Sequence, residues 1–439
     1  MFELSRDAEL PPDAHLESGQ ERMMQQYYEM VSVSENSSDS SERTISFSGY
    51  IHHNNRDNVE TVSPGLKICA HDKDNSSSSD ELKLISGKDA CSIVNHVGFW
   101  SIGPISNIDE DEDSGLLDVV FIITTFHPSF QVIASDGKHY NDVYDKTKYV
   151  NVSDGVYSDD ILIDTVDLPA FWIFDTIHQG WKFFNDLGFD HSGNDHVIVL
   201  WENNVKAGDY LPNPPRVSNP SILSAHYYPD LKQIRLSGES RNPNADANDP
   251  ILILHEYGHH IMNIAYSRVN SSNGYDPDEM RCFASHSTYR VFFDENHSSS
   301  PRCAWIEGWA SFVTLIVNGN PDYYQSEAGF GIDYETGLGT HGTVILWDDE
   351  SSTNIGVDSA AIEGRVTSVL WDIFDSNIDT VSSNRMGQDI YSTDFDLMWN
   401  VFNSNTDSQN IVRPADDISE WWNDWLVLKP DTLTSTLDI

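Results

Sequence analysis

Basic residues are scarce in this chain of 439 residues: 25 lysines and arginines stand against 70 aspartates and glutamates, and the formal net charge is −45. A surface of this sign repels nucleic acids and anionic membranes, so the composition argues against both as partners. No apolar run approaches the length of a membrane-spanning helix, which excludes membrane insertion. The acidic excess is typical of a solvated surface in a salty medium or outside the cell.

Cysteine is also scarce, with four in the whole chain. They form two local pairs, Cys69 with Cys91 and Cys282 with Cys303, from which we predict two local disulfides; four buried free thiols are the alternative. Disulfides indicate an oxidising compartment, so we expect an extracellular or cell-surface protein. The first residues, MFELSRDAELPPDAHLES, nevertheless show neither the basic start nor the apolar core of a signal peptide.

The length allows two or three domains, and 39% hydrophobic residues are enough for real cores. Short alternating strands separated by polar turns predict an N-terminal β-sandwich, and a mixed pattern with helical spacing follows it. We therefore predict a multidomain protein, in which an all-β sandwich precedes an α+β domain with a mostly helical C-terminal half. The predicted parts are an N-terminal helix and linker (1–42), the sandwich (43–135), a connector (136–165) and the α+β domain (166–439).

An acidic run, Asp109–Asp113, lies within the predicted sandwich. Clustered carboxylates bind Ca²⁺ in some loops, and in others they form a solvated acidic loop, which is the commoner case. Calcium is therefore a second cofactor candidate that the sequence leaves open.

The strongest chemical signal is HEYGH, at the end of the run DPILILHEYGHH. Asp249 is a good N-cap and Pro250 suits the first helical position, so we expect a buried helix to begin here. Because residues four apart share a helix face, His255 and His259 can bind one metal ion. Glu256 lies about 100° around the helix from His255, beside the metal, where it can accept a proton from a bound water. The alternative is a buried helix whose histidines are satisfied by hydrogen bonds.

A catalytic zinc takes three protein ligands and keeps one position open, so a third ligand is needed. Glu307 is the acidic residue within AWIEGWASFVTLIV, which reads as a second buried helix. A buried glutamate needs a partner, and zinc would be one; an ion pair with Arg302 or Arg365 is the alternative. Gly308 would let two helices approach closely. We predict Glu307 as the third ligand of one catalytic Zn²⁺ ion.

HEYGHH followed by WIEGWA resembles the gluzincin zinc metallopeptidases, the thermolysin-like clan, and a later EGRV…LWDIFD extends the likeness over roughly residues 166–425. The resemblance implies a zincin fold that hydrolyses a protein or peptide substrate. It implies zinc binding by His255, His259 and Glu307, with Glu256 as the general base. The turn positions of the N-terminal strands resemble transthyretin-like or carboxypeptidase-regulatory-like sandwiches.

The chain departs from the gluzincin pattern in two places. The separation between His259 and Glu307 is more than twice that of the best-known members, and Ser311 stands where they carry an aspartate one turn after the third ligand. We therefore expect another residue to orient a ligand histidine. The resemblance also implies that Gln233–Gly238 forms an edge strand that pairs with extended substrate.

A further hydrogen-bond donor usually stabilises the oxyanion of such a reaction. We rank first His341, in the glycine-rich GLGTHGTV, and Arg365, and expect both to contribute to catalysis. The other donors considered are Tyr323 and Tyr324. Glu363 or Asp372 is expected to accept a hydrogen bond from a zinc-binding histidine and so orient its ring.

Three functions from two classes fit these patterns, and a zinc endopeptidase is the first. An aminopeptidase needs carboxylates for the free amine of its substrate; QIRLSG has none, although Glu239 follows it at once. A non-catalytic surface binding protein with a structural zincin domain is the third, and Glu256 argues against it because binding alone has no use for a general base. The oligomeric state stays open.

Overall fold

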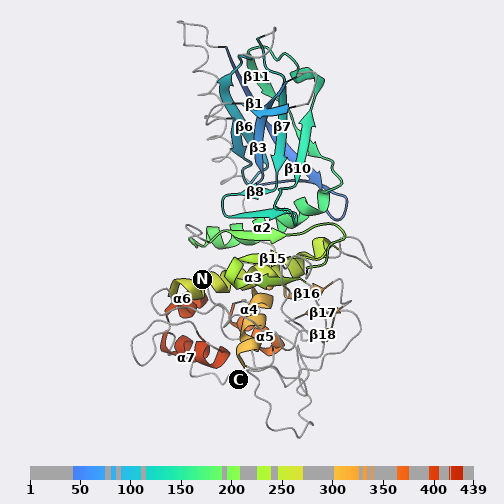
Figure 1. The fold of residues 1–439 in the computed structure, drawn as a ribbon. Coiled ribbons are helices and arrows are strands. Elements are labelled where there is room, and N and C mark those ends of the chain that lie inside the picture. Colours follow the sequence, from blue (N-terminus) through green and yellow to red (C-terminus); the bar gives the residue numbers. More distant parts are fainter. Residues whose placement is uncertain are drawn as a thin grey trace, which may run out of the picture.

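The computed structural model shows a strand-rich N-terminal part followed by a part with more helix (Figure 1). The described residues are 43–74, 81–85, 90–109, 115–189, 195–207, 225–238, 246–269, 301–325, 330–333, 338–339, 363–374, 395–404, 415 and 417–428. The predicted N-terminal helix and most of the acidic run after Asp109 lie outside them. Within these ranges no helix combines the length and the apolar character that a bilayer crossing needs.

Two sheets form most of the N-terminal part. In the first, the long strand β1 pairs in parallel with β11 along its first half and with β12 along its second, and it pairs antiparallel with β6 and β2. The second sheet is antiparallel, in the order β10-β7-β3-β4, and β5 also pairs with β3. The strands are β1 (Thr44–Asn54), β2 (Glu60–Val62), β3 (Lys67–Asp74), β4 (Glu81–Leu84), β5 (Cys91–Ile93), β6 (Phe99–Ser106), β7 (Val119–Thr124), β10 (Asn141–Asp145), β11 (Gly155–Ser158) and β12 (Ile161–Ile163).

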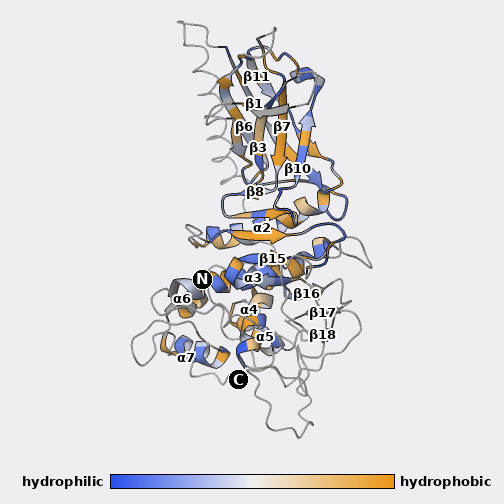
Figure 2. Ribbon diagram, viewed as in Figure 1, coloured by the Kyte–Doolittle hydropathy of each residue, from blue (hydrophilic) through white to orange (hydrophobic). Residues whose placement is uncertain are grey.

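Aromatic side chains join the two sheets. Phe47 on β1 and Trp100 on β6 pack edge-on against Phe121 on β7, with ring centroids 5.0 and 5.1 Å apart. All three side chains are at most 1% exposed. Hydrophobic residues run along β7 in Figure 2, as expected for a strand buried between two layers. The predicted sandwich is therefore confirmed.

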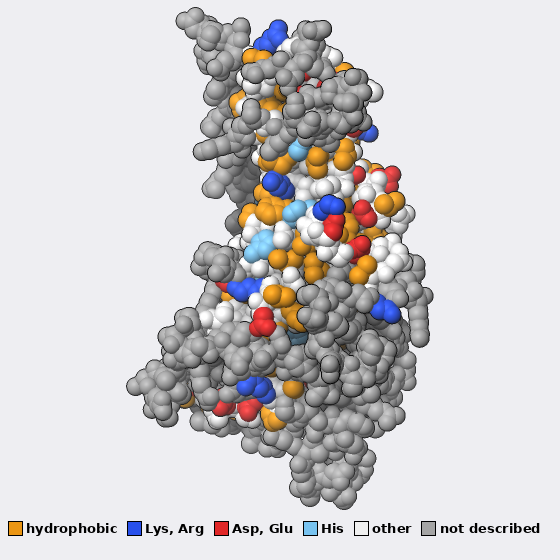
Figure 3. Space-filling model, viewed as in Figure 1, with side chains coloured by type: hydrophobic (Ala, Val, Ile, Leu, Met, Phe, Trp, Pro, Cys, Tyr) orange, Lys and Arg blue, Asp and Glu red, His pale blue; other side chains and the backbone are white. Residues whose placement is uncertain are grey.

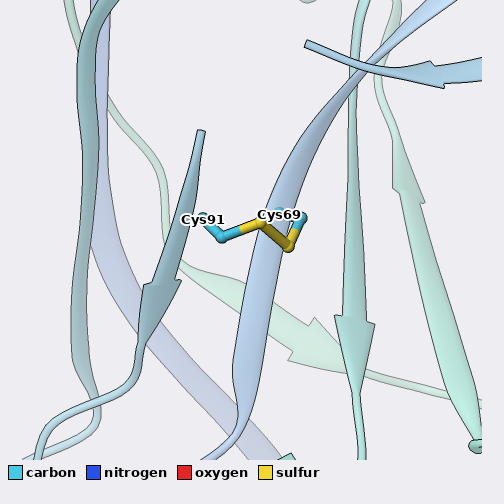
Figure 4. The surroundings of a disulfide bond; sticks show 2 residues. All are labelled: Cys69 and Cys91. Carbon is cyan, nitrogen blue, oxygen red and sulfur yellow. A yellow bond between two sulfur atoms is a disulfide. The ribbon is translucent and has the colours of Figure 1, made fainter. Parts of the chain in front are cut away.

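A disulfide links Cys69 on β3 to Cys91 on β5 (Figure 4). The two residues are direct partners in the strand pairing, so the bond closes a short loop within the second sheet. This confirms the first of the two predicted disulfides. Cys303 is also disulfide-bonded, and its predicted partner, Cys282, lies outside the described residues.

A third sheet joins the two parts of the chain. Its order is β14-β15-β13-β9-β8; β9, β13 and β15 run parallel, and the outer strands β8 and β14 are antiparallel. After β9 the chain returns to the N-terminal sheets as β10–β12 and reaches β13 through α2. The domain limits at residues 135 and 165 remain predictions. The new elements are β8 (Phe126–His127), β9 (Phe130–Ile133), α2 (Leu168–Asp186), β13 (Val197–Leu200), β14 (His226–Tyr228) and β15 (Gln233–Arg235).

Helices dominate the C-terminal half, as predicted. Helix α3 packs against α2, β14 and α4, and α4 packs in turn against α5. The small antiparallel sheet β16-β17-β18 adjoins α3 and α4 through β16. These elements are α3 (Pro250–Val269), α4 (Pro301–Asn318), β16 (Asp322–Gln325), β17 (Phe330–Asp333), β18 (Leu338–Gly339), α5 (Glu363–Phe374), α6 (Phe395–Ser404) and α7 (Ile418–Leu428).

Arg56, just after β1, ties the sandwich to the helices. Its guanidinium donates to the Thr176 hydroxyl on α2 and to the Ala247 carbonyl before α3, each at 2.9 Å. Burial lowers the pKa of Arg56 to about 10, so the group stays charged at neutral pH. The same side chain thus contacts α2 and the turn that leads into α3.

Histidine side chains gather near the middle of the molecule on the face shown in Figure 3. Another histidine, His178 on α2, is buried: it is 6% exposed, and its ring lies close to those of His127 and Trp181. Burial, followed by the charge of Lys182, lowers the pKa of His178 to about 4, against an ordinary value of 6.5. The folded protein therefore keeps this ring neutral over a pH range in which the unfolded chain protonates it.

We expect His178→Gln to reduce the acid sensitivity of the fold. Because the folded-state pKa is the lower one, His178 contributes stability above about pH 6.5 that is lost as the pH falls towards 4. The shift corresponds to about 3 kcal/mol at one pKa unit per 1.36 kcal/mol. Urea unfolding at pH 7 and pH 4.5 should show a smaller loss of unfolding free energy in the variant. The half-buried His196 supplies the control, His196→Gln, and equal pH dependence in all three proteins would refute the assignment.

Candidate metal centre

Helix α3 begins where the sequence predicts. The Leu252 amide donates to the Asp249 carboxylate at 3.1 Å, so Asp249 caps the helix, and Pro250 is the first helical residue. The helix is buried along its central turns, with His255 7% and His259 8% exposed. The local signals therefore fix the start of α3, and with it the positions of both histidines on the helix. Tertiary packing then buries the two side chains.

Glu307 lies on α4, buried at 6% exposure. Its Oε2 atom is 3.0 Å from His255 Nε2 and 3.1 Å from His259 Nε2. The two imidazole rings are at 89° to one another, with centroids 4.8 Å apart. Both Nε2 atoms approach the same carboxylate oxygen of Glu307. Among the described residues, these three side chains form the one group with metal-ligand spacing, with ligand atoms within 4.8 Å of one another.

This donor set fits zinc. Two imidazole nitrogens and a carboxylate oxygen, each about 2.0–2.1 Å from a tetrahedral ion, lie roughly 3.4 Å from one another. The nitrogen–oxygen separations of 3.0 and 3.1 Å are only slightly shorter. Three protein ligands leave a fourth position for water or substrate, as in catalytic zinc sites. A metal such as zinc can therefore bind here with small movements of the side chains.

Gly258 brings the two ligand-bearing helices together. A Cβ atom at Gly258 would lie 2.8 Å from the Ala310 Cα atom and 3.0 Å from its carbonyl oxygen, so the helix backbones nearly touch there. His255 is three residues before Gly258, and Glu307 is three residues before Ala310. The close crossing is therefore one turn from a ligand on each helix. Gly308 lets two helices approach closely, as predicted, and the second helix is α5. A Cβ atom at Gly308 would lie 2.7 Å from Val366 Cβ.

We expect Gly258→Ala to weaken metal binding and to destabilise the fold by about 1–3 kcal/mol, because the added methyl group meets backbone that cannot rotate away. Zinc affinity from chelator competition and unfolding in urea test this. Gly180→Ala is the matched control, since its methyl group would meet the Tyr257 ring, 2.8 Å away on the same helix α3. Equal zinc affinity in wild type and Gly258→Ala would show that the spacing of α3 and α4 does not set the site.

The far side of the His255 ring meets two hydroxyl groups. Its Nδ1 atom lies 3.3 Å from Ser311 Oγ and 3.4 Å from Tyr323 Oη. The expectation that a residue other than Ser311 orients a ligand histidine is thus wrong in part, because Ser311 itself reaches His255. Tyr323 is one of the candidate oxyanion donors, but its hydroxyl contacts the ring nitrogen on the side away from Glu307.

His260 follows the second ligand and points away from it. Its Nδ1 atom is 3.1 Å from the Tyr227 hydroxyl and its Nε2 atom 3.1 Å from the Asp195 carbonyl. Asn263, one turn later, donates to the same Tyr227 hydroxyl at 2.7 Å. The contacts with Tyr227 fasten β14 to the face of α3 that carries His260 and Asn263.

The expectation that Gln233–Gly238 forms an edge strand for the substrate is wrong. Gln233–Arg235 form β15, which pairs with β13 on one side and β14 on the other. The amides of Leu236 and Gly238 donate to the carbonyls of Leu200 and Val205. This segment is therefore interior to the sheet, and in the described part of the sheet β14 is the outer strand next to α3.

The structure describes the remaining predicted residues only in part. Glu256 is 5% exposed on α3, between the two histidines in sequence, and Glu363 is 3% exposed at the start of α5. Arg365 and Asp372 lie on α5, but their side chains are outside the described residues, and His341 lies outside them altogether. The roles of Glu256, His341 and Arg365 stay predictions.

A buried histidine pair from one helix and a glutamate from the next define an HExxH-type metallopeptidase domain with a candidate metal triad. The sequence comparison agrees, because the family profile of the mycolysin C-terminal domain matches residues 216–436. The chain therefore belongs to the mycolysin C-terminal domain family.

Other comparisons add no further relative. No curated protein matches the chain. Among solved structures, a 9R-lipoxygenase from Cyanothece PCC8801 matches with a TM-score of 0.19 and 9% identity, over 41% of this chain and 28% of its own. A likeness this low carries no conclusion about fold or function.

Proposed function

We propose that this protein is a zinc-dependent endopeptidase that hydrolyses peptide bonds in protein or peptide substrates. The observation that carries the proposal is the convergence of His255 Nε2, His259 Nε2 and Glu307 Oε2 within a buried site. Membership of the mycolysin C-terminal domain family supports it. Glu256, buried beside the first ligand on the same helix, supplies the carboxylate that hydrolysis requires.

When bound, a zinc ion supplies Lewis acidity at the substrate carbonyl and lowers the pKa of water towards neutrality. The protein's own groups do the remaining work. His255 and His259 bind as neutral imidazoles, and Glu307 offsets part of the ion's charge. Glu256 accepts the proton of the attacking water and afterwards delivers it to the leaving amine, so one carboxyl group serves as base and then as acid.

The outer strand β14 supports an extended substrate in this proposal. A peptide running along β14 would add a strand to the third sheet through main-chain hydrogen bonds. The contacts of Tyr227 with His260 and Asn263 hold β14 against α3, so such a peptide would lie beside the HExxH helix. His341 and Arg365 remain our proposed donors to the oxyanion of the substrate.

An extracellular or cell-surface location is part of the proposal. The Cys69–Cys91 disulfide supports it, because such bonds persist in oxidising compartments. The strongly acidic composition, with a formal charge of −45, also suits an exposed protein in a salty medium.

The test is cleavage of a mixed peptide library by zinc-loaded protein, by protein stripped with a chelator, and by stripped protein given zinc again. We expect cleavage in the first and third samples only. Internal cut sites would support an endopeptidase, and release of single N-terminal residues would replace it with an aminopeptidase. Zinc binding without cleavage in any sample would favour the non-catalytic binding protein and contradict the proposal.

A further inference from the structure

His255 makes a different contact with each of its ring nitrogens. Nε2 faces the other metal-ligand atoms, 3.0 Å from Glu307 Oε2. Nδ1 faces the interior of the protein, 3.3 Å from Ser311 Oγ and 3.4 Å from Tyr323 Oη. The groups at Nδ1 therefore contact the ligand histidine on the side of the ring away from Glu307.

Ser311 and Tyr323 reach this nitrogen from different elements. Ser311 lies on α4, four residues after Glu307, so it shares the helix face that carries the third ligand. Tyr323 lies on β16, which packs against both α3 and α4. Both side chains are 0% exposed, and His255 is 7% exposed, so water does not compete for these contacts. Removal of either hydroxyl should therefore change the hydrogen bonding of the His255 ring.

The chemistry fixes the direction of these hydrogen bonds when a metal is bound. A histidine that binds a metal through Nε2 is neutral and carries its proton on Nδ1. The Nδ1–H group then donates, and the hydroxyl oxygens of Ser311 and Tyr323 accept. Both distances exceed the usual 2.7–3.2 Å range for such bonds, as expected where two acceptors share one donor.

We propose that Ser311 and Tyr323 are positioning residues that jointly hold the ring of the ligand histidine His255 in its metal-binding orientation. The proposal rests on the proposed function for its metal, but it needs no hydrolysis. A carboxylate in this place would raise the basicity of the ligand and add a negative charge. Two neutral hydroxyls orient the ring and add no negative charge beside His255.

Because two hydroxyl acceptors share the Nδ1–H group of His255, the effects of removing them on zinc affinity should not add. In Ser311→Ala the Tyr323 hydroxyl can take the full Nδ1–H bond, and in Tyr323→Phe the Ser311 hydroxyl can do so. We expect each single variant to lose less than about fivefold in zinc affinity, and the double variant to lose the roughly 10–100-fold that removal of the hydrogen-bond partner of a metal ligand costs. Zinc affinity is measured by competition with a chromophoric chelator.

Two variants control for the loss of a buried hydroxyl alone. Thr314 lies on α4 one turn beyond Ala310 and donates to its carbonyl at 3.2 Å, so Thr314→Val deletes a hydroxyl that does not face His255. Tyr266 donates to the Ala415 carbonyl at 2.7 Å, so Tyr266→Phe matches Tyr323→Phe. Both controls should bind zinc within about twofold of wild type. A double variant no weaker than the controls would overturn the proposal.

Proton NMR of the Co²⁺-substituted protein gives a second readout. The shifted ligand-histidine N–H signals, recognised by their loss in D₂O, should be sharp in wild type, and one of them should be broadened by solvent exchange in the double variant. An unchanged signal would also overturn the proposal. Wild type that binds zinc without cleaving peptides would refute the proposed function and leave this inference intact, whereas wild type without zinc would refute both.

Discussion

Replacement of Glu256 by glutamine is expected to abolish peptide hydrolysis while zinc stays bound. Glutamine keeps the shape of the side chain but cannot accept a proton, and loss of a general base typically costs roughly 10²–10⁴-fold in rate. Glu256 is not one of the three grouped ligand residues, so zinc content should match that of wild type. The measurements are kcat on a quenched peptide and zinc per chain.

The control for this variant is Glu60→Gln, which removes one acidic charge from a side chain that is 62% exposed. It should hydrolyse the peptide at the wild-type rate. If Glu256→Gln retained full activity, another group would have to accept the proton and the proposed mechanism would be wrong. If it lost zinc as well as activity, Glu256 would belong to the ligand set.

Replacement of Glu307 by alanine is expected to have the largest effect on metal binding. Oε2 of Glu307 lies within 3.1 Å of both histidines, so the variant leaves two ligands where a catalytic zinc site uses three. Loss of a group that only orients a metal ligand costs up to about 100-fold in metal affinity. Loss of the ligand itself should therefore lower zinc affinity by more than that. Hydrolysis should disappear at zinc concentrations that saturate wild type.

Glu363→Gln is the matched comparison, because Glu363 is another buried glutamate, 3% exposed, on the neighbouring helix α5. It lies outside the metal-ligand group, so its effect on zinc affinity should be smaller. Normal zinc affinity in Glu307→Ala would move the third ligand elsewhere. A larger loss in Glu363→Gln than in Glu307→Ala would move it to α5.

Local signals explain why much of the site could be predicted. The cap at Asp249, the proline after it and the four-residue spacing of the histidines all belong to one short segment, and each acts within a helical turn. Glu307 was predictable for another reason. A carboxylate within an apolar helix has to meet a partner, and the only open question was which partner.

Long-range contacts explain what the sequence did not predict. Whether a strand is interior or at an edge depends on its neighbours in space, and β15 is interior because β13 pairs with it from another part of the chain. Likewise, Ser311 and Tyr323 are 56 and 68 residues from His255 in sequence, so no periodic pattern connects them to it. Ser311 gave a weak signal, as a polar residue one turn after Glu307.

Anomalous diffraction at the zinc edge, from crystals grown with zinc, tests the central claim most directly. A single strong peak within bonding distance of His255 Nε2, His259 Nε2 and Glu307 Oε2 is the predicted result, with a fourth position open to water. A peak at other residues, or no peak between these three side chains in zinc-saturated protein, would contradict the assignment of this triad as the catalytic metal centre.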